Sequence, residues 1–304
     1  MARAVMYEAY GGPEVLELRE VEEPQAGPGE VRVRIVVAGL NPVDWKIVAG
    51  ASPSYARALP AGVGNDFAGI IDQVGEGVTG WAVGDEVFGG ARHRALADFV
   101  TVDPATLRRK PEQLTWEQAG SLDIAGRTAV AAVEAVAVRA DDTVLVSAAA
   151  GGVGVISSQL ALATGATVIG TASEANHQFL RELGVIPVSY GEGLADRIRS
   201  LAPAGITAVL DHHGRETVDL AIELGVDPSR VNTIADKPYA AEHGMKTDGG
   251  GEAPGDALDR VVELAVAGRL VLPIDTVYPL ERARDAYEQL RAGHLRGKIV
   301  IRVN

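Results

Sequence analysis

A run of apolar residues that ends in a glycine-rich turn sets the strongest constraint on the fold of this chain. Val144-Leu-Val-Ser predicts a buried strand, Ala149-Ala-Gly-Gly-Val-Gly154 follows it, and residues 155–163 predict a buried helix. In such a strand, turn and helix, Gly151 lets the backbone approach a pyrophosphate and Gly154 lets the helix pack closely on the strand. The free N–H groups at the start of the helix then bind phosphate. A tight turn without a ligand remains the alternative.

Strands and helices are predicted to alternate after this turn. Short apolar strands at 167–170, 208–211 and 230–234 are separated by segments long enough for helices. This alternation is typical of a parallel sheet with helices on both faces. We therefore expect an α/β protein whose middle part is a doubly wound, Rossmann-type dinucleotide-binding domain.

The two ends of the chain have a different pattern. Residues 1–110 are rich in Gly, Pro and short β-branched runs, such as the alternating segment 31–37. Near the C-terminus, strands are predicted at 270–278 and 298–303, with a helix at 281–292 between them. These segments predict a compact, mostly-β domain.

The end of the second strand of a Rossmann unit decides between NADH and NADPH. An acidic residue there binds both ribose hydroxyls and repels a 2′-phosphate. Here Ser173 stands at the strand tip, and Glu174 lies one residue further on. This leaves room for a phosphate held by Ser173, Asn176 and His177, although the loop has no Arg or Lys. We expect NADP(H), with NAD(H) as the open alternative.

Charge and composition exclude several classes of function. The chain has 28 Lys and Arg against 41 Asp and Glu, a net charge of −13, so nucleic acid and anionic membranes are unlikely partners on electrostatic grounds. It has no Cys, which excludes disulfides, thiolate catalysis and Cys-ligated zinc. The N-terminus has no apolar run typical of a signal peptide. We expect a cytoplasmic enzyme with a small-molecule substrate.

Two further motifs look like ligand sites. Gly75-Glu-Gly-Val-Thr-Gly80 matches G-x-G-x-x-G, but no helix follows it, so we predict a turn between strands. Asp211-His-His-Gly stands at a predicted strand end and looks like a metal-ligand group. At the carboxyl edge of the sheet we expect it to line the cofactor cleft or face solvent.

Several motifs together resemble one enzyme superfamily. They are Gly39-Leu-Asn-Pro-Val-Asp-Trp-Lys46, Gly64-Asn-Asp-Phe-Ala-Gly69, the segment 74–87, the glycine turn, and Gly297-Lys298. In these motifs the chain resembles the medium-chain dehydrogenase/reductase superfamily, in its zinc-free, quinone oxidoreductase-like branch. The resemblance implies a GroES-like catalytic domain at 1–118 and 268–304 and a Rossmann domain at 119–267. Substrate and nicotinamide then meet in the cleft between them.

The resemblance also defines the expected chemistry. Zinc-dependent relatives have a Cys where Asn41 stands, and a His-Glu pair where Asn65-Asp66 stands. Without a Lewis acid, hydride must go to an acceptor that is already activated. We expect an NADPH-dependent reductase of quinones or α,β-unsaturated carbonyls that binds no metal. The alternatives are an enoyl or alkenal reductase of one pathway, and a cofactor-binding protein that has lost turnover.

Site residues and assembly follow from the same resemblance. The expected catalytic residues are Asn41, Asp44, Tyr55 and Thr128. Tyr55 stands in for a tyrosine that relatives have shortly after Gly50, and Trp45 is the alternative for that role. The expected cofactor-binding residues are Ala150, Gly151, Gly152, Val153, Gly154, Ser173, Asn176, Tyr190, Ile234 and Lys298.

Three of these residues have structural alternatives, and the assembly is a further expectation. Asn41 and Asp44 are also suited to capping a turn or helix, and Lys298 to facing solvent at the start of a strand. We expect a homodimer that extends the Rossmann sheet at the edge near Arg230–Ile234 or Leu270–Ile274.

Overall fold

The computed structural model describes residues 1–51 and 56–304, so the predicted Tyr55 lies outside the described residues. The described chain divides into two compact units. The first unit comprises Met1–Ile124, Ile274–Gly293 and Lys298–Asn304, and the second comprises Ala125–Pro273 and His294–Gly297. Among the described residues, no helix combines the length and the apolar character needed to cross a bilayer.

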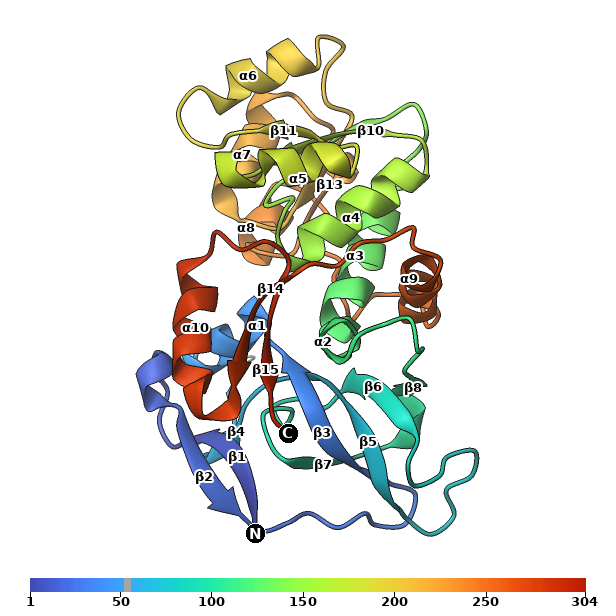
Figure 1. Ribbon diagram of the computed structural model, residues 1–304. Coiled ribbons are helices and arrows are strands. Elements are labelled where there is room, and N and C mark those ends of the chain that lie inside the picture. Colours follow the sequence, from blue (N-terminus) through green and yellow to red (C-terminus); the bar gives the residue numbers. More distant parts are fainter. Residues whose placement is uncertain (52–55) are drawn as a thin grey trace. The chain divides into compact units, whose positions relative to one another are not determined.

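The first unit is mostly β, as the Gly- and Pro-rich pattern predicts, and its strands pair antiparallel except β14 and β15, which pair parallel (Figure 1). The smaller sheet has the order β2 (Glu17–Val21), β1 (Ala2–Tyr7), β4 (Ala61–Gly62). The larger sheet has the order β14 (Ile274–Pro279), β15 (Lys298–Arg302), β3 (Val31–Gly39), β5 (Asp66–Val74), β6 (Glu86–Gly90), β8 (Leu107–Arg109), and β7 (Phe99–Val102) also pairs with β3. Its described residues also form the α-helices α1 (Pro42–Val48), α2 (Trp116–Ala119) and α10 (Ala283–Ala292).

Side-chain periodicity explains these elements. In β3, the alternate residues Val31, Val33, Ile35 and Val37 are fully buried, as period-two alternation requires. In α10, the buried residues Ala283, Ala286, Tyr287 and Leu290 follow helical spacing, so one face of the helix packs on the unit.

Two predictions for this unit have different outcomes. Residues 75–80 lie between β5 and β6 and no helix follows them, as predicted. The strand predicted at 270–278 is wrong at its start: β14 begins at Ile274, after Pro273, which has no N–H to donate to a ladder.

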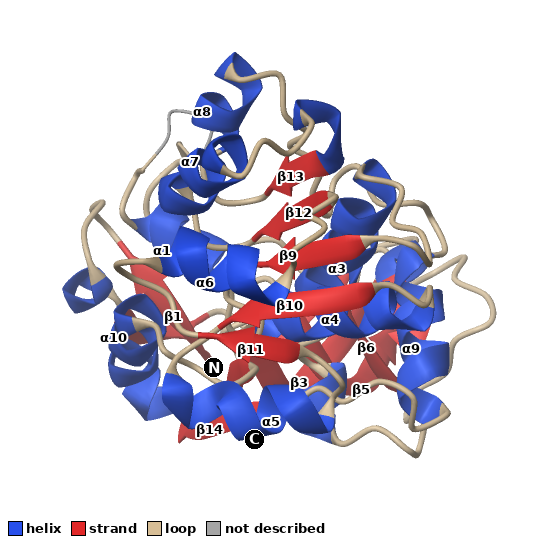
Figure 2. Ribbon diagram, turned by 90° about the horizontal axis from the view of Figure 1, so that it is seen from above, coloured by secondary structure: helices blue, strands red, loops and turns tan. Residues whose placement is uncertain are grey.

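The second unit contains a parallel sheet, which Figure 2 shows between two layers of helices. Among the described residues its strands have the order β11 (Ile186–Val188), β10 (Thr167–Thr171), β9 (Thr143–Val146), β12 (Ala208–Asp211), β13 (Val231–Thr233). Along the chain, β10 and β11 are added on one side of β9, and β12 and β13 are then added on the other side. The strand order therefore reverses between β9 and β12. This is the arrangement of a doubly wound dinucleotide-binding sheet.

Helices cover both faces of this sheet. They are α3 (Asp123–Ala135), α4 (Gly152–Ala163), α5 (His177–Glu182), α6 (Leu194–Leu201), α7 (Arg215–Glu223) and α8 (Lys237–Glu242), and α9 (Ala257–Val266) follows further along the chain. Successive residues of β9 point to opposite faces: Val144 and Val146 pack with side chains of α3, α4 and α5, whereas Leu145 packs with side chains of α6, α7 and α8. The predicted helix at 155–163 begins earlier than expected, because the last residues of the glycine turn form its first turn.

The unit boundaries differ from the expected domain boundaries at 118 and 267 for local reasons. Residues 119–124 stay with the first unit, where a Cβ on Gly39 of β3 would lie 2.5 Å from the Gly120 carbonyl oxygen. Residues before Ile274 stay with the second unit, where Val271 N–H donates to Gln159 Oε1 of α4 at 2.7 Å. Residues 294–297 join the second unit because Gly297 N–H donates to the Ala150 carbonyl at 2.7 Å.

Of the two segments expected at the edge of the parallel sheet, one lies there. β13 is the end strand, but Lys246 covers it: Lys246 N–H donates to Val231 O at 2.9 Å, and Thr233 N–H donates to Lys246 O at 3.1 Å. The Asn232 side chain continues this pairing, since its amide exchanges hydrogen bonds with the backbone of Asp248. The segment 270–274, the other expected edge, is not a strand of this sheet. The expected edge near Arg230–Ile234 is therefore present, with part of its backbone paired to Lys246, and the expectation for Leu270–Ile274 is wrong.

Candidate active site and cofactor site

The glycine turn after β9 is shaped by close backbone contact. A Cβ on Gly154 would lie 2.2 Å from the Ala148 carbonyl oxygen, so no other residue fits there without moving the helix. Ala148 itself has a left-handed φ of 47°. Its N–H donates to Thr171 Oγ1, and its carbonyl accepts from Gly151 N–H at 2.9 Å. The turn thus brings the N-terminus of α4 against the end of β9, which suits binding of a pyrophosphate.

A cation that the local sequence lacks reaches the tip of β10 from the C-terminal part of the chain. Arg296 Nε donates to Asn176 Oδ1 at 2.9 Å, and its Nη2 donates to the Ala175 carbonyl at 3.1 Å. The guanidinium also lies over the Phe179 ring, 5.2 Å from its centre. These contacts fix Arg296 beside the loop that begins at Ser173, where a phosphate was expected.

Other predicted phosphate-side residues gather at the same loop. Asn176 is buried, and its Nδ2 lies 3.4 Å from Ser173 Oγ. His177 Nε2 lies 3.3 Å from the Ala172 carbonyl. Tyr190 is half exposed, and its hydroxyl pairs with His294 Nδ1 at 3.0 Å. The structure therefore brings Ser173, Asn176 and Arg296 together, and the segment 294–297 also supplies a partner for Tyr190.

Two predicted residues lie elsewhere in the second unit. Thr128 is buried on α3, and a Cβ on Gly250 would lie 3.1 Å from its hydroxyl. Ile234 follows β13, and its N–H donates to the Asp211 carbonyl at 3.0 Å. Among the described residues, neither Thr128 nor Ile234 forms a hydrogen bond with the loop at Ser173.

A buried polar network occupies the first unit around the start of α1. Asn41 N–H donates to Asp44 Oδ2 at 2.9 Å, so Asp44 caps the helix, and Asn65 Nδ2 donates to Asp44 Oδ1. Asn41 Nδ2 donates to Asp66 Oδ2 at 3.0 Å, while Asn41 Oδ1 accepts from Lys298 Nζ at 2.5 Å. Lys298 is only 4% exposed, so it does not face solvent at the start of β15.

Burial dominates the electrostatics of this network. It raises the pKa of Asp44 to about 6, against the opposing effect of the Asn41 N–H and the Asn65 amide. Burial also raises the pKa of Asp66, which the Lys298 ammonium opposes. Burial lowers the pKa of Lys298, against the attraction of Asp66 and Asp44. The two buried carboxyls are therefore harder to ionise than free carboxyls, and the buried amine is harder to protonate than a free lysine.

The residues at this position do not suit a zinc ion. Zinc in proteins is bound by thiolates, imidazoles and carboxylates. Here Asn41 and Asn65 present amides, and the Lys298 ammonium already lies 3.8 Å from Asp66 Oδ2. Within the described part of the chain, no group of three or more His, Asp or Glu side chains is arranged to hold a metal.

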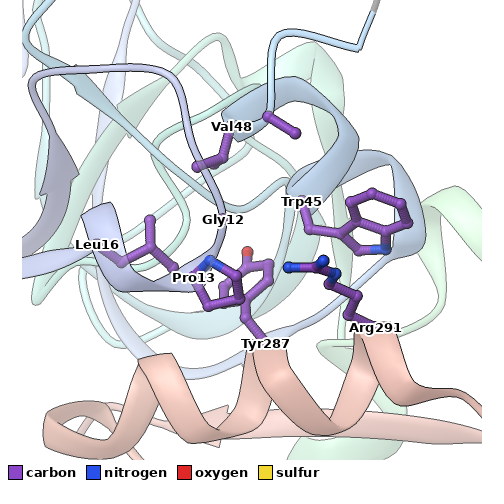
Figure 3. A pocket seen from close by; sticks show the side chains of 8 residues that line it. Gly12, Pro13, Leu16, Trp45, Val48, Tyr287 and Arg291 are labelled. Atoms are coloured by element: carbon purple, nitrogen blue, oxygen red, sulfur yellow. The ribbon is translucent and has the colours of Figure 1, made fainter.

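A cavity of about 310 Å³ lies beside α1 in the first unit (Figure 3). Its walls are mostly apolar, and the Tyr287 hydroxyl and the Arg291 guanidinium point into it. Tyr287 also lies close enough to Asp44 to affect the pKa of that carboxyl. Trp45 of α1 contributes its indole to the lining of this cavity.

Two protein families match this sequence. The family described as alcohol dehydrogenase GroES-like domain matches residues 27–148. The family described as zinc-binding dehydrogenase matches residues 133–301. Together these two matches account for nearly the whole chain.

Individual proteins agree with these matches. The quinone oxidoreductase of Coxiella burnetii is 29% identical, with a TM-score of 0.87 over 100% of this chain and 99% of that one. A mycobacterial protein solved in complex with NADPH is 27% identical, with a TM-score of 0.88 over 100% of both chains. A mycocerosic acid synthase-like polyketide synthase of Mycolicibacterium smegmatis is 30% identical over 96% of this chain. The chain spans only 15% of the length of that synthase.

Proposed function

This chain belongs to the medium-chain dehydrogenase/reductase superfamily, in its quinone oxidoreductase-like branch, and on that basis we propose that it is an NADPH-dependent reductase. Its proposed acceptor is a quinone or an α,β-unsaturated carbonyl. The observation that carries the choice of NADPH is Arg296, which is held against the Ser173–Asn176 loop at the tip of β10. The mycobacterial relative that was solved with NADPH supports the same choice.

The residues of the second unit are proposed to bind the cofactor in two places. The glycine turn and the N-terminus of α4 bind the pyrophosphate, because unpaired N–H groups and the helix dipole favour an anion there. Ser173, Asn176, Tyr190 and Arg296 bind the 2′-phosphate through neutral and charge-assisted hydrogen bonds. When bound, NADPH supplies the hydride.

The residues of the first unit are proposed to act on the acceptor without a metal. Hydride addition to a quinone or enone places negative charge on a carbonyl oxygen, which a fixed donor stabilises. Asn41 is suited to this role: Asp66 takes one N–H of its amide and Lys298 holds its carbonyl, so its second amide N–H is oriented. The proton that completes the reduction comes from water. Thr128 is proposed to contact the nicotinamide, and Lys298 to act by positioning Asn41.

A second candidate function is favoured by the polyketide synthases among the relatives. Segments of those enzymes are 30% and 34% identical to this chain over 96% and 90% of its length. This similarity favours reduction of a single enoyl intermediate of a biosynthetic pathway over reduction of free quinones. Both candidates use the same hydride chemistry, so they differ only in the acceptor.

The experiment that tests this proposal is NADPH oxidation followed at 340 nm. The acceptors are 1,4-benzoquinone, 9,10-phenanthrenequinone, a series of 2-alkenals and a 2-enoyl thioester. We expect turnover with at least one quinone or alkenal, and turnover with the thioester alone would favour the second candidate. Binding of NADPH without turnover of any acceptor would mean a cofactor-binding protein that has lost activity.

A further inference from the structure

Basic residues gather in the first unit, at the turn that follows β6. Arg92, His93 and Arg94 are consecutive in this turn, and Arg57 Nη2 donates to His93 Nε2 at 2.9 Å. The Arg94 N–H donates to the Ala91 carbonyl at 2.9 Å, which fixes the backbone of the turn. Arg92 and Arg94 are exposed, and Arg57 and His93 are half-buried. We call Arg57, Arg92, His93 and Arg94 the basic cluster.

Among the described residues, no carboxylate is ion-paired with an arginine of the basic cluster. Arg32 and Arg230, by contrast, each lie against a carboxylate, at 2.9 and 2.6 Å. Burial lowers the pKa of His93, and the charges that lower it further are those of Arg57 and Arg92. The basic cluster is therefore a place of positive charge on a chain whose net charge is −13, and such a place attracts an anion.

The turn of the basic cluster adjoins the buried network around Asn41. Its first residue, Ala91, donates its N–H to the Asn65 carbonyl at 2.7 Å. Gly90, the residue before it, pairs with Asp66 in the ladder between β5 and β6. Asn65 and Asp66 both belong to the buried network. The basic cluster is therefore anchored to the same backbone as residues proposed to act on the acceptor.

Arg57 lies near the end of α1 that is opposite Asn41. Its N–H donates to Tyr10 Oη at 2.6 Å, and a Cβ on Gly50 would lie 3.2 Å from the Tyr10 ring. Gly50 comes two residues after α1 ends, whereas Asn41 caps its start, and a helix of this length spans about 10 Å. An anion at the basic cluster is therefore set apart from a carbonyl at Asn41, as a charged group at the far end of a longer substrate would be.

We propose that the basic cluster binds the phosphate groups of an enoyl thioester carried on phosphopantetheine, as in coenzyme A or on a carrier protein. Guanidinium groups donate paired hydrogen bonds to phosphate oxygens. The pantetheine arm is a long flexible chain between phosphate and thioester, which suits a cluster set apart from Asn41. This inference rests on the proposed function, whose second candidate reduces an enoyl intermediate. A simple quinone or alkenal carries no phosphate and gains nothing from the basic cluster.

The test compares crotonyl-CoA, crotonyl-4′-phosphopantetheine and crotonyl-pantetheine, which share the pantetheine arm. NADPH is kept saturating, so that the adenosine end of coenzyme A does not occupy the proposed cofactor site. In the wild type, KM for crotonyl-CoA is expected to be about tenfold below that for crotonyl-pantetheine and to rise with salt. The double variant Arg92→Gln, Arg94→Gln is expected to lose this advantage, with kcat unchanged for both substrates.

A matched control removes the same charge elsewhere in the first unit. Arg109→Gln together with Arg282→Gln replaces two exposed arginines, each of which pairs with a surface carboxylate. This control is expected to change KM for none of the three thioesters.

The phosphopantetheine thioester distinguishes the two sources of the phosphate. A KM as low as that of crotonyl-CoA would support the inference with the phosphate that coenzyme A and carrier proteins share. A low KM for crotonyl-CoA alone would support it with coenzyme A as the source. Equal KM for all three thioesters in the wild type, or an equal loss for all three in the Arg92→Gln, Arg94→Gln variant, would overturn the inference and leave the proposed function intact.

A binding measurement tests the inference without turnover. Calorimetry of crotonyl-CoA is carried out on protein saturated with NADP⁺. The wild type is expected to bind about tenfold more tightly than the Arg92→Gln, Arg94→Gln variant, and equal constants or no binding would overturn the inference. Such binding without turnover of any quinone, alkenal or thioester would instead contradict the proposed function.

Discussion

Replacing Arg296 by methionine is expected to remove the preference for NADPH. Methionine keeps an unbranched apolar stem against Phe179 but loses the guanidinium that bonds Asn176 Oδ1 and the Ala175 carbonyl. NADH has a free hydroxyl where NADPH has the 2′-phosphate. The substitution is therefore expected to weaken NADPH binding and to leave NADH binding almost unchanged.

The magnitude follows from the exposure and the contacts of Arg296. Two unit charges 4 Å apart attract by about 4 kcal/mol at an effective dielectric constant near 20. Arg296 is exposed, so solvent and salt reduce this value. A hydrogen bond to a charged group contributes roughly 1.5–3 kcal/mol. A loss of about 2–3 kcal/mol, or about 30- to 150-fold in affinity, is therefore expected for NADPH.

The assay is titration of each nucleotide by its fluorescence at two salt concentrations. The wild-type affinity for NADPH is expected to fall as salt rises, and that salt dependence is expected to be smaller in Arg296→Met. Arg181→Met is the control, because it removes an equal charge from an exposed position on α5.

Two results would refute this reasoning. Equal weakening of NADPH and NADH would mean that Arg296 only supports the loop at Ser173. An unchanged NADPH constant would mean that the 2′-phosphate binds elsewhere.

Four further predictions concern the turn, the buried network, the metal and the assembly. Gly154→Val is expected to leave the protein folded but to abolish the thermal shift by NADPH, because the added side chain meets the Ala148 carbonyl; a normal shift would contradict this. The pKa of Asp44 is raised from 3.8 to about 6 in the folded protein, so its stabilising effect is present below pH 4 and lost as pH rises through 6. Urea unfolding is therefore expected to show about 3 kcal/mol of pH dependence that Asp44→Asn lacks, and equal profiles would refute the assignment. Activity is expected to survive exhaustive chelation, and one zinc per chain by metal analysis would overturn that expectation. A homodimer is expected from the family, and a mass near 32 kDa by light scattering would exclude it.

Features that depend on neighbouring residues were predictable from the sequence. The strand, glycine turn and helix around Gly151 and Gly154 are encoded within about twenty consecutive residues, and the structure has the same elements there. The same holds for the alternation of strands and helices in the second unit, since each strand is a short apolar run. Local periodicity and turn chemistry are enough to predict these elements from the sequence.

Features that depend on distant residues were not predictable. Arg296 lies 120 positions after its partner Asn176, and no local pattern places it at the tip of β10. Its signal in the sequence was the basic segment 294–298, of which only Gly297-Lys298 entered the sequence-based prediction. Lys298 at the start of a strand has the pattern of a solvent-exposed residue, but pairing with Asn41, 257 positions away, buries it. The backbone hydrogen bonds between Lys246 and β13 also depend on the path of an irregular loop, which no periodic pattern in the sequence predicts.

Direct transfer of hydride from NADPH to the acceptor tests the account most directly. The protein is incubated with NADPH that carries deuterium at both positions of nicotinamide C4 and with a 2-alkenal, and the product is analysed by mass spectrometry. The account predicts one deuterium at the β-carbon of the saturated aldehyde. With unlabelled NADPH in deuterated water, it predicts deuterium at the α-carbon and none at the β-carbon. Reduced product without deuterium from NADPH, or no product with any quinone, alkenal or enoyl thioester, would contradict it.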